Sequence, residues 1–157
     1  MKAEDGAEAL RNWEAIKARE KPDVGEVSAL GGIPLGLPAL QKAQRAQGRA
    51  ARVGFDWPDA AGAVAKVEEE IGELRRAMEE ADPRHTGEEI GDVLFSLVNL
   101  SRFLGVDAEE ALRRATDKFM RRFREVERRM RQEGRAMEPA AMARMDEHWE
   151  TVKAQDG

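Results

Sequence analysis

Four carboxylates in two short acidic segments are the side chains of this sequence best suited to do chemistry. Glu70 and Glu73 lie three residues apart in the first segment, and Glu89 and Asp92 lie three apart in the second. Residues at this spacing share one face of an α-helix. If the two helices pack antiparallel across a short connection, the pairs face each other, and their charges require hard divalent cations. Mg²⁺ is the expected ion, with Mn²⁺ as a substitute.

The same residues also have ordinary interpretations. Glu89 can form a capping box with Thr86, and Asp92 can form a salt bridge with one of the many arginines. Glu68 and Glu69, taken alone, are expected on a solvated face. The sequence has 0 Cys and 2 His, which excludes thiolate zinc sites and argues against the Glu-x-x-His pairs of diiron bundles. Any metal must therefore be held by oxygen.

The second acidic pair lies on a segment that is apolar on almost every side. A helix of this kind is buried, and Glu89, Asp92, Ser96 and Asn99 form one polar line along it. The few helices of one protomer would struggle to cover it, so we predict a homodimer or higher homo-oligomer. The apolar residues of the segment are Ile90, Val93, Leu94, Phe95, Leu97, Val98, Leu100 and Leu104.

The elements that must hold these segments are helices. Only 5% of the residues are aromatic, and the composition favours Ala, Glu, Arg and Leu, which are helix formers, so we predict an all-α fold. Capping residues, prolines and glycines give the expected boundaries. The helices are expected over about residues 4–20, 38–52, 56–82, 86–105 and 107–134, with a short one opened by Pro139.

The length and net charge of the chain limit the domain organisation and the partners that can be expected. The 157 residues suit one globular unit, which we divide into residues 1–37, an N-terminal helix and a Gly/Pro-rich connection, and residues 38–157, a catalytic helical domain. The net charge of −5 argues against stable nucleic-acid binding. The N-terminal segment lacks the basic start and apolar stretch of a signal peptide. No apolar run is close to the roughly 20 residues that a membrane-spanning helix needs. We therefore expect a cytoplasmic protein without a membrane partner.

The two acidic segments resemble the Glu-Glu-x-x-Glu and Glu-x-x-Asp motifs of the MazG family of nucleoside triphosphate pyrophosphohydrolases. The resemblance covers nearly the whole chain. It is closest to the second domain of two-domain members, preceded by a segment similar to an interdomain connection. Further matching segments follow in the same order and are Arg52–Trp57, Gly91–Phe95, Val98–Arg102, Lys118-Phe119 and Arg121–Phe123.

The resemblance implies an all-α helical bundle assembled from protomers, which cleaves the bond between the α- and β-phosphates and releases a monophosphate and pyrophosphate. It implies that Glu70, Glu73, Glu89 and Asp92 hold Mg²⁺. By the same resemblance Glu69 assists, by orienting or deprotonating the attacking water. This agrees with the physical roles of metal ions, which neutralise phosphate charge and lower the pKa of bound water.

Four further residues match substrate-binding positions of the family, namely Lys118, Arg122, Trp149 and Lys153. Lys118 and Arg122 lie four residues apart, as do Trp149 and Lys153, so the members of each pair share a helix face. The cationic side chains suit phosphate, and the indole suits a base or ribose. Without the resemblance, we would interpret the charged residues as solvated and Trp149 as core.

The sequence departs from the family where many relatives place a Lys shortly before the Glu-x-x-Asp motif. This chain has Arg84 and His85 there, so a basic contact at this point is left open. Phe55 and Trp57 could contribute to a base pocket, although structural packing is the favoured interpretation for both.

The implied activity is Mg²⁺-dependent hydrolysis of canonical or damaged nucleoside triphosphates, a house-cleaning role in the nucleotide pool. Phosphoribosyl-ATP and dUTP pyrophosphohydrolases of the same superfamily would use the same acids. A non-catalytic helical dimerisation module would keep the acids for a structural ion. The sequence does not choose the base or the sugar.

Overall fold

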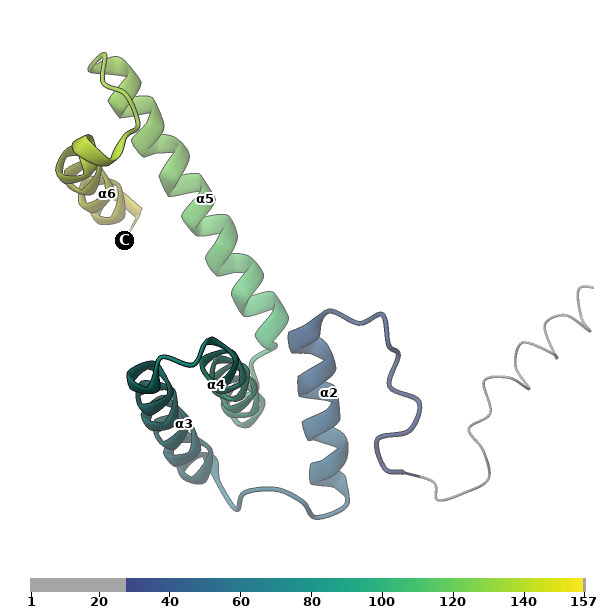
Figure 1. The fold of residues 1–157 in the computed structure, drawn as a ribbon. Coiled ribbons are helices and arrows are strands. Elements are labelled where there is room, and N and C mark those ends of the chain that lie inside the picture. Colours follow the sequence, from purple (N-terminus) through teal and green to yellow (C-terminus); the bar gives the residue numbers. More distant parts are fainter. Residues whose placement is uncertain (1–27, 157) are drawn as a thin grey trace, which may run out of the picture.

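The structure is a computed structural model that describes residues 28–156. Every regular element in this range is helical, without a strand, which confirms the predicted all-α class (Figure 1). The helix expected over residues 4–20 lies outside the described residues. Within them, no helix combines the length and the apolar character needed to cross a membrane. The elements are α2 (Ala39–Arg52), α3 (Ala60–Glu80), α4 (Pro83–Phe103), α5 (Ala108–Gln132), the 3-10 turn η1 (Pro139–Ala141) and α6 (Met142–Asp156).

The start of α4 differs from the sequence-based expectation. The helix begins at Pro83, because the Asp82 carboxylate accepts hydrogen bonds at 2.9 and 3.3 Å from two N–H groups of the first turn. Thr86 therefore lies inside the helix, where its hydroxyl donates to the Asp82 carbonyl at 2.9 Å. The alternative of a capping box between Thr86 and Glu89 is wrong for this reason.

Two other helix boundaries also differ. α3 begins at Ala60 and not near Asp56, because the Asp59 carboxylate accepts a hydrogen bond from the Gly62 N–H at 3.1 Å and caps the helix. α6 has 15 residues and is longer than the short helix expected after Pro139. The remaining ends agree with the predictions.

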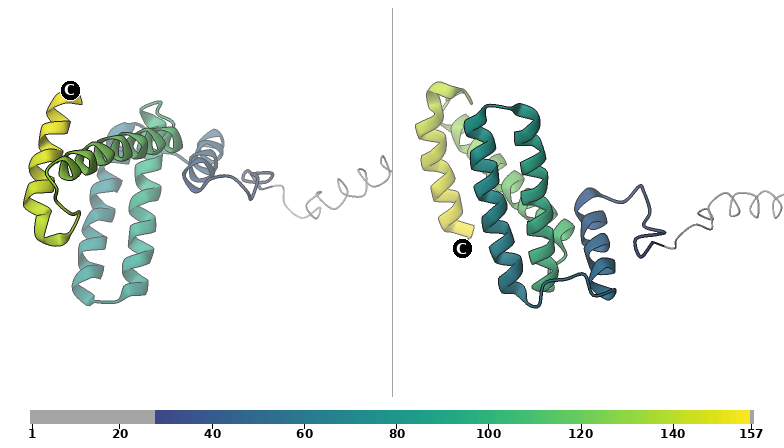
Figure 2. Two further views of the ribbon diagram at one scale, coloured as in Figure 1. Left: turned by 90° about the horizontal axis from the view of Figure 1, so that it is seen from above. Right: turned by 60° about the horizontal axis from the view of Figure 1, so that its bottom comes forward.

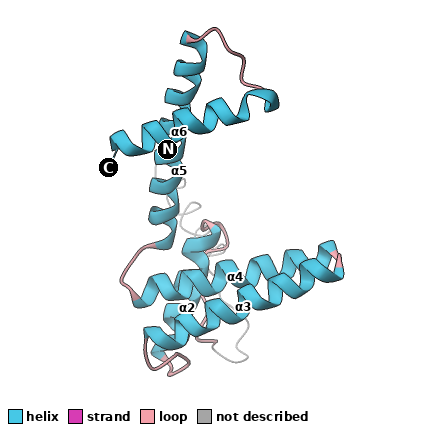
Figure 3. Cartoon of the chain, turned by 90° about the vertical axis from the view of Figure 1, so that its left-hand side faces the viewer, coloured by secondary structure: helices cyan, strands magenta, loops and turns pink. Residues whose placement is uncertain are grey.

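The helices form two groups. α3 and α4 run antiparallel and side by side, joined only by Ala81 and Asp82, and α2 packs against α4 (Figures 1 and 3). α5 leads away from this group, and α6 folds back onto its far end (Figure 2). Among the described elements, α6 makes no contact with α3 or α4. The second group is held by a small core of Val126, Met130 and Val152, with Met145 and Trp149 packed against it.

α4 is not buried, contrary to the prediction from its apolar composition. Ile90, Leu94, Phe95 and Leu97 are each between 42 and 49% exposed. The physical reason is that α2 and α3 are the main helices packed along α4, and they cannot cover a helix that is apolar on every side. One apolar face of α4 therefore stays open in the single chain.

Candidate metal centre

The antiparallel pairing of α3 and α4 brings the predicted acids together. Glu70, Glu89 and Asp92 each place one carboxylate oxygen within 4.8 Å of the others, and the same holds for Glu69, Glu70 and Glu73. Glu70 belongs to both groups and links them. The spacing of three residues along each helix sets each pair, and the register between the helices sets the meeting of the pairs. The five acids thus form one cluster around Glu70.

Burial differs sharply within this cluster. Glu70 is only 6% exposed and Glu89 is half-buried, whereas Asp92 is exposed. The expected burial of Asp92 is therefore wrong, because this residue borders an open cavity and does not lie in the core. The Glu70 Oε2 and Glu89 Oε2 atoms are buried and have no hydrogen-bond partner among residues 28–156. Buried carboxylate oxygens require a partner, and a set of oxygen donors suits a hard divalent cation such as Mg²⁺. The residues present therefore fit such an ion.

A lysine on α3 balances part of the negative charge. Lys66 Nζ lies 2.6 Å from Glu70 Oε1 and 2.9 Å from Glu69 Oε1. The contact with Glu70, and after it the contact with Glu69, raises the pKa of the Lys66 ammonium well above its usual value. The sequence analysis did not single out Lys66, although its spacing of four residues before Glu70 is a signal that could have identified it.

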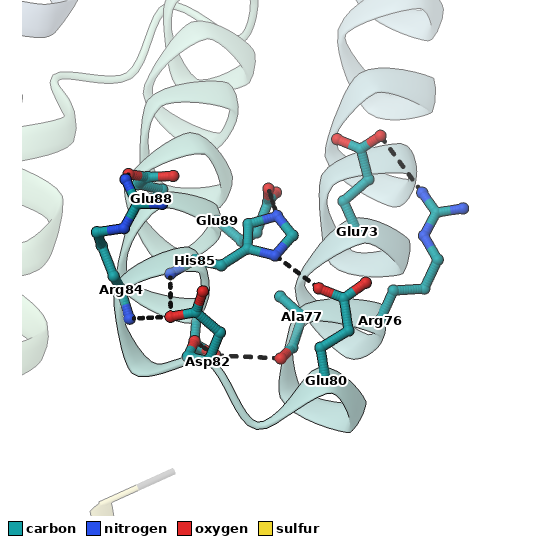
Figure 4. A network of polar contacts seen from close by, with 10 residues as sticks. Glu73, Arg76, Ala77, Glu80, Asp82, Arg84, His85, Glu88 and Glu89 are labelled. Atoms are coloured by element: carbon teal, nitrogen blue, oxygen red, sulfur yellow. Dashed lines mark hydrogen bonds and ion pairs between the residues drawn. The ribbon is translucent and has the colours of Figure 1, made fainter.

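A histidine on α4 makes the corresponding contact with the half-buried acid Glu89. His85 Nε2 lies 3.1 Å from Glu89 Oε1, and His85 Nδ1 lies 2.9 Å from Glu80 Oε2 (Figure 4). The contact with Glu80 is the main reason that the pKa of the imidazole is raised above its usual value. The basic contact left open at this position is thus made by His85 to an acid of the cluster, while Arg84 points to Glu88 at 3.4 Å.

A cavity of about 700 Å³ opens beside the acids and is bordered by Glu70 and Asp92. Phe55 and Trp57 both line it. Phe55 is 82% exposed, so structural packing does not describe it, whereas Trp57 lies against Gly62, where an added Cβ would meet the indole at 3.2 Å. Other residues that line the cavity include the aromatic Phe95 and the polar Gln47, Ser96 and Asn99.

Gln47 is a polar residue of this cavity that the sequence analysis missed. Its amide Nε2 donates to the Phe95 carbonyl at 2.8 Å, and its Oε1 is buried with no hydrogen-bond partner within residues 28–156. A lone glutamine on a helix carries no sequence signal of burial, because its burial depends on how α2 meets α4.

The predicted substrate-binding residues gather on the other helix group. Trp149 of α6 packs on Phe119 of α5 with ring centroids 5.4 Å apart, and Arg122 Nε donates to Asp156 at 2.8 Å. Lys153 pairs with its helix neighbour Glu150 at 2.9 Å. Because α6 does not contact α3 or α4 among the described elements, the described chain keeps Trp149 and Lys153 apart from the acids. Lys118 and Arg122 lie on α5, which contacts α4 near its start, but neither forms an ion pair with an acid of the cluster among the described residues.

Comparison with known proteins places this geometry in a family. The model of the MazG nucleotide pyrophosphohydrolase domain matches residues 60–127, which run from the start of α3 into α5 and include the whole acidic cluster. Residues 60–127 are thus a MazG nucleotide pyrophosphohydrolase domain by similarity. Residues Trp149 and Lys153 lie outside the matched MazG span. The all-α fold and the acidic motifs thus agree with the resemblance seen in the sequence.

Several curated relatives match over most of the chain. It is 47% identical over 153 residues to the nucleoside triphosphate pyrophosphohydrolase/pyrophosphatase MazG of Thermotoga maritima, covering 94% of this chain and 56% of that protein. It is 46% identical over 156 residues to the nucleoside triphosphate pyrophosphohydrolase of Escherichia coli K12, covering 98% and 59%. A Bacillus subtilis protein, the uncharacterized YabN, is 42% identical over 154 residues, covering 98% and 31%. The chain thus spans a little over half the length of the first two relatives.

Proposed function

We propose that this MazG chain hydrolyses nucleoside triphosphates between the α- and β-phosphates, giving a monophosphate and pyrophosphate. The observation that carries the proposal is a pair of buried oxygens in the acidic cluster, Glu70 Oε2 and Glu89 Oε2, for which the described residues supply no partner. The names of the two most similar relatives reported above support the same activity. Glu70, Glu73, Glu89 and Asp92 are the proposed ligands of Mg²⁺, which Mn²⁺ can replace.

The chain's own residues suggest how the reaction proceeds. A bound divalent ion would supply neutralisation of phosphate charge and Lewis acidity. Water attacks the α-phosphorus, the bond to the oxygen bridging the α- and β-phosphates breaks, and pyrophosphate leaves with that electron pair. Glu69, whose side chain is 57% exposed at the rim of the cluster, is the proposed acceptor of the proton that the water loses. Lys66, beside Glu69, lies where it can offset charge on the phosphates.

The cavity beside the cluster is the proposed site of the nucleoside. Its aromatic side chains offer stacking surfaces for a base, and Ser96 and Asn99 offer hydrogen bonds to polar groups. A volume of about 700 Å³ lies within the range of small-molecule sites. Since Glu70 and Asp92 border this cavity, a base bound there would leave the triphosphate at the acids.

A second copy of the chain completes the proposed site. Trp149 and Lys153 lie on α6, which contacts neither α3 nor α4 among the described elements, and α4 keeps an apolar face that the described helices leave open. Lys118 and Arg122 lie on α5 beside them. We propose a homodimer in which the α5–α6 group of one copy approaches the acids of the other. This arrangement would also cover apolar surface that is costly to leave in water. Exposed apolar residues of α5 that it would bury are Leu112, Phe119, Met120 and Phe123.

The broader setting follows from the same proposal. Residues 38–157 are the proposed catalytic domain, with residues 1–37 as an N-terminal helix and connection. The proposed role is house-cleaning of the cytoplasmic nucleotide pool, and the net charge of −5 argues against stable binding to nucleic acid.

The test is pyrophosphate release from a panel of nucleoside triphosphates with Mg²⁺, with Mn²⁺ and with chelator. We expect monophosphate and pyrophosphate, with no turnover in chelator and none for Glu70→Gln. Phosphoribosyl-ATP and dUTP in the panel separate the related pyrophosphohydrolases. Orthophosphate with a diphosphate product would contradict the assignment, and absence of turnover for every substrate would favour a non-catalytic dimerisation module.

A further inference from the structure

The two buried carboxylates of the cluster are held in the same way. In each, a basic residue four positions earlier on the same helix contacts Oε1: Lys66 contacts Glu70 at 2.6 Å, and His85 contacts Glu89 at 3.1 Å. In each, the second oxygen, Oε2, is buried and has no hydrogen-bond partner in the described part of the chain. The symmetry of the two contacts indicates that holding one oxygen leaves the other available to a ligand between the helices.

The histidine is itself held from both sides. Its Nδ1 lies 2.9 Å from Glu80 Oε2 at the end of α3, while its Nε2 faces Glu89 on α4 (Figure 4). The imidazole thus spans the turn between the two helices, and rotation of the ring would lose one of the two contacts. A carboxylate with one oxygen held by a fixed donor cannot rotate freely. One oxygen of Glu89 lies within 4.8 Å of oxygens of Glu70 and Asp92, and the contact with His85 leaves Oε2 as the oxygen available to an ion shared with them.

We propose that His85 is a positioning residue of the metal centre, which holds Glu89 Oε1 so that Glu89 Oε2 is presented to the divalent ion. This inference rests on the proposed function, because it requires Glu89 to be a ligand. It makes the Glu80–His85–Glu89 chain an outer support of the site. Partners of this kind, which orient metal-binding side chains, typically affect metal affinity by about 10–100-fold.

The competing interpretation treats His85 only as positive charge near the acids. A cation beside a metal site opposes the binding of another cation, so its removal would strengthen Mg²⁺ binding. Positioning predicts the opposite sign, because a rotating Glu89 offers its oxygen less often. The two interpretations can therefore be separated by substitutions that change the geometry but remove the same charge.

The test uses His85→Gln and His85→Asn in the full chain. A glutamine amide nitrogen lies near the place of Nε2 and can still donate to Glu89, whereas the shorter asparagine reaches only the place of Nδ1, beside Glu80. Both variants lack the ring and its charge. Mn²⁺ binding is measured by electron paramagnetic resonance without nucleotide, so that the readout is independent of turnover. We expect the dissociation constant to rise about tenfold or more for asparagine and to stay within about threefold for glutamine.

Arg84→Gln is the matched control, since Arg84 is the adjacent residue, is 82% exposed and pairs with Glu88 outside the cluster. It should leave Mn²⁺ binding unchanged. Equal weakening in both His85 variants, or parent-like or tighter binding in His85→Asn, would overturn the inference while the parent still binds. A parent that binds no Mn²⁺ would refute the proposed metal site itself and the inference with it. Melting curves in chelator show that each variant is folded.

Discussion

Replacing Asp92 with asparagine should stabilise the metal-free protein and abolish its response to Mg²⁺. An oxygen of Asp92 lies within 4.8 Å of oxygens of Glu70 and Glu89, and among residues 28–156 no basic side chain forms an ion pair with it. Two unit charges 4 Å apart repel by about 1 kcal/mol in water and about 4 kcal/mol near a protein surface. Because Asp92 is exposed, the gain in free energy of unfolding should be about 1–2 kcal/mol, which corresponds to about 2–8 °C in melting temperature.

In excess Mg²⁺ the substitution should have the opposite effect on stability, because it removes the stabilisation that the ion gives to the parent. An ion that binds only the folded state at 100 times its dissociation constant stabilises by about 2.7 kcal/mol, so the parent should melt about 5–10 °C higher in excess Mg²⁺. Without Asp92 the site loses a ligand, and most of this rise should disappear together with pyrophosphate release.

The assay is a set of melting curves in Mg²⁺ and in chelator for the parent, for Asp92→Asn and for Glu88→Gln. Glu88 is a matched control, because it removes one carboxylate from the same helix but its partner is Arg84, at 3.4 Å. Glu88→Gln should keep both the Mg²⁺ response and the turnover.

A structural role for Asp92 would give a different pattern. Loss of one partner of a buried salt bridge would lower the free energy of unfolding by about 3–5 kcal/mol with or without metal. A large destabilisation of Asp92→Asn in chelator would therefore refute the reasoning. So would a variant that keeps the Mg²⁺ response and the activity.

Light scattering at low micromolar concentration should give a mass of two chains rather than 17.5 kDa. Leu94→Glu, on the open face of α4, should yield single chains. A parent protein that is fully active as a single chain would contradict the proposed dimer. Arg122→Gln should raise KM for the triphosphate about tenfold or more, since a charged hydrogen bond contributes about 1.5–3 kcal/mol, and an unchanged KM would remove Arg122 from the site. The hydrogen bond from Arg144 is the main reason that the pKa of Glu133 is lowered from 4.5 to about 2. The contact therefore stabilises the α5–α6 group above pH 4.5, and this stabilisation is lost as the pH falls toward 2. The melting temperatures of the parent and Glu133→Gln should accordingly converge at acidic pH, and a constant difference would show that the contact contributes nothing.

Helix boundaries show where local patterns suffice and where they do not. The start of α5 could be predicted, because Asp107 caps it by accepting a hydrogen bond from the Glu110 N–H at 2.9 Å, a contact within four residues. The start of α4 could not be chosen as easily, because both Asp82 and Thr86 are good capping residues. Pro83, which suits the first helical position, makes Asp82 the cap.

The sequence by itself determined which acids share a helix face, because the α-helix repeats every 3.6 residues wherever it forms. Glu70 with Glu73, and Glu89 with Asp92, follow from that repeat. The resemblance to the MazG motifs was also visible in the sequence, through the identity and order of the matching residues. The same rule would have predicted the contact of Lys66 with Glu70.

Only the tertiary structure decided what depends on how one helix lies against another. The register of α3 and α4 determines that Glu70 joins Glu89 and Asp92. It also leaves Glu70 Oε2 and Glu89 Oε2 without a partner among the residues that the structure describes. The reach of His85 to Glu80 depends on the turn between these helices. The separation of Trp149 from the acids depends on where α5 and α6 go, and the exposure of Asp92 depends on the cavity that it borders. Such contacts join residues far apart in the chain, and their geometry is set by the packing of whole helix faces, which no local spacing encodes.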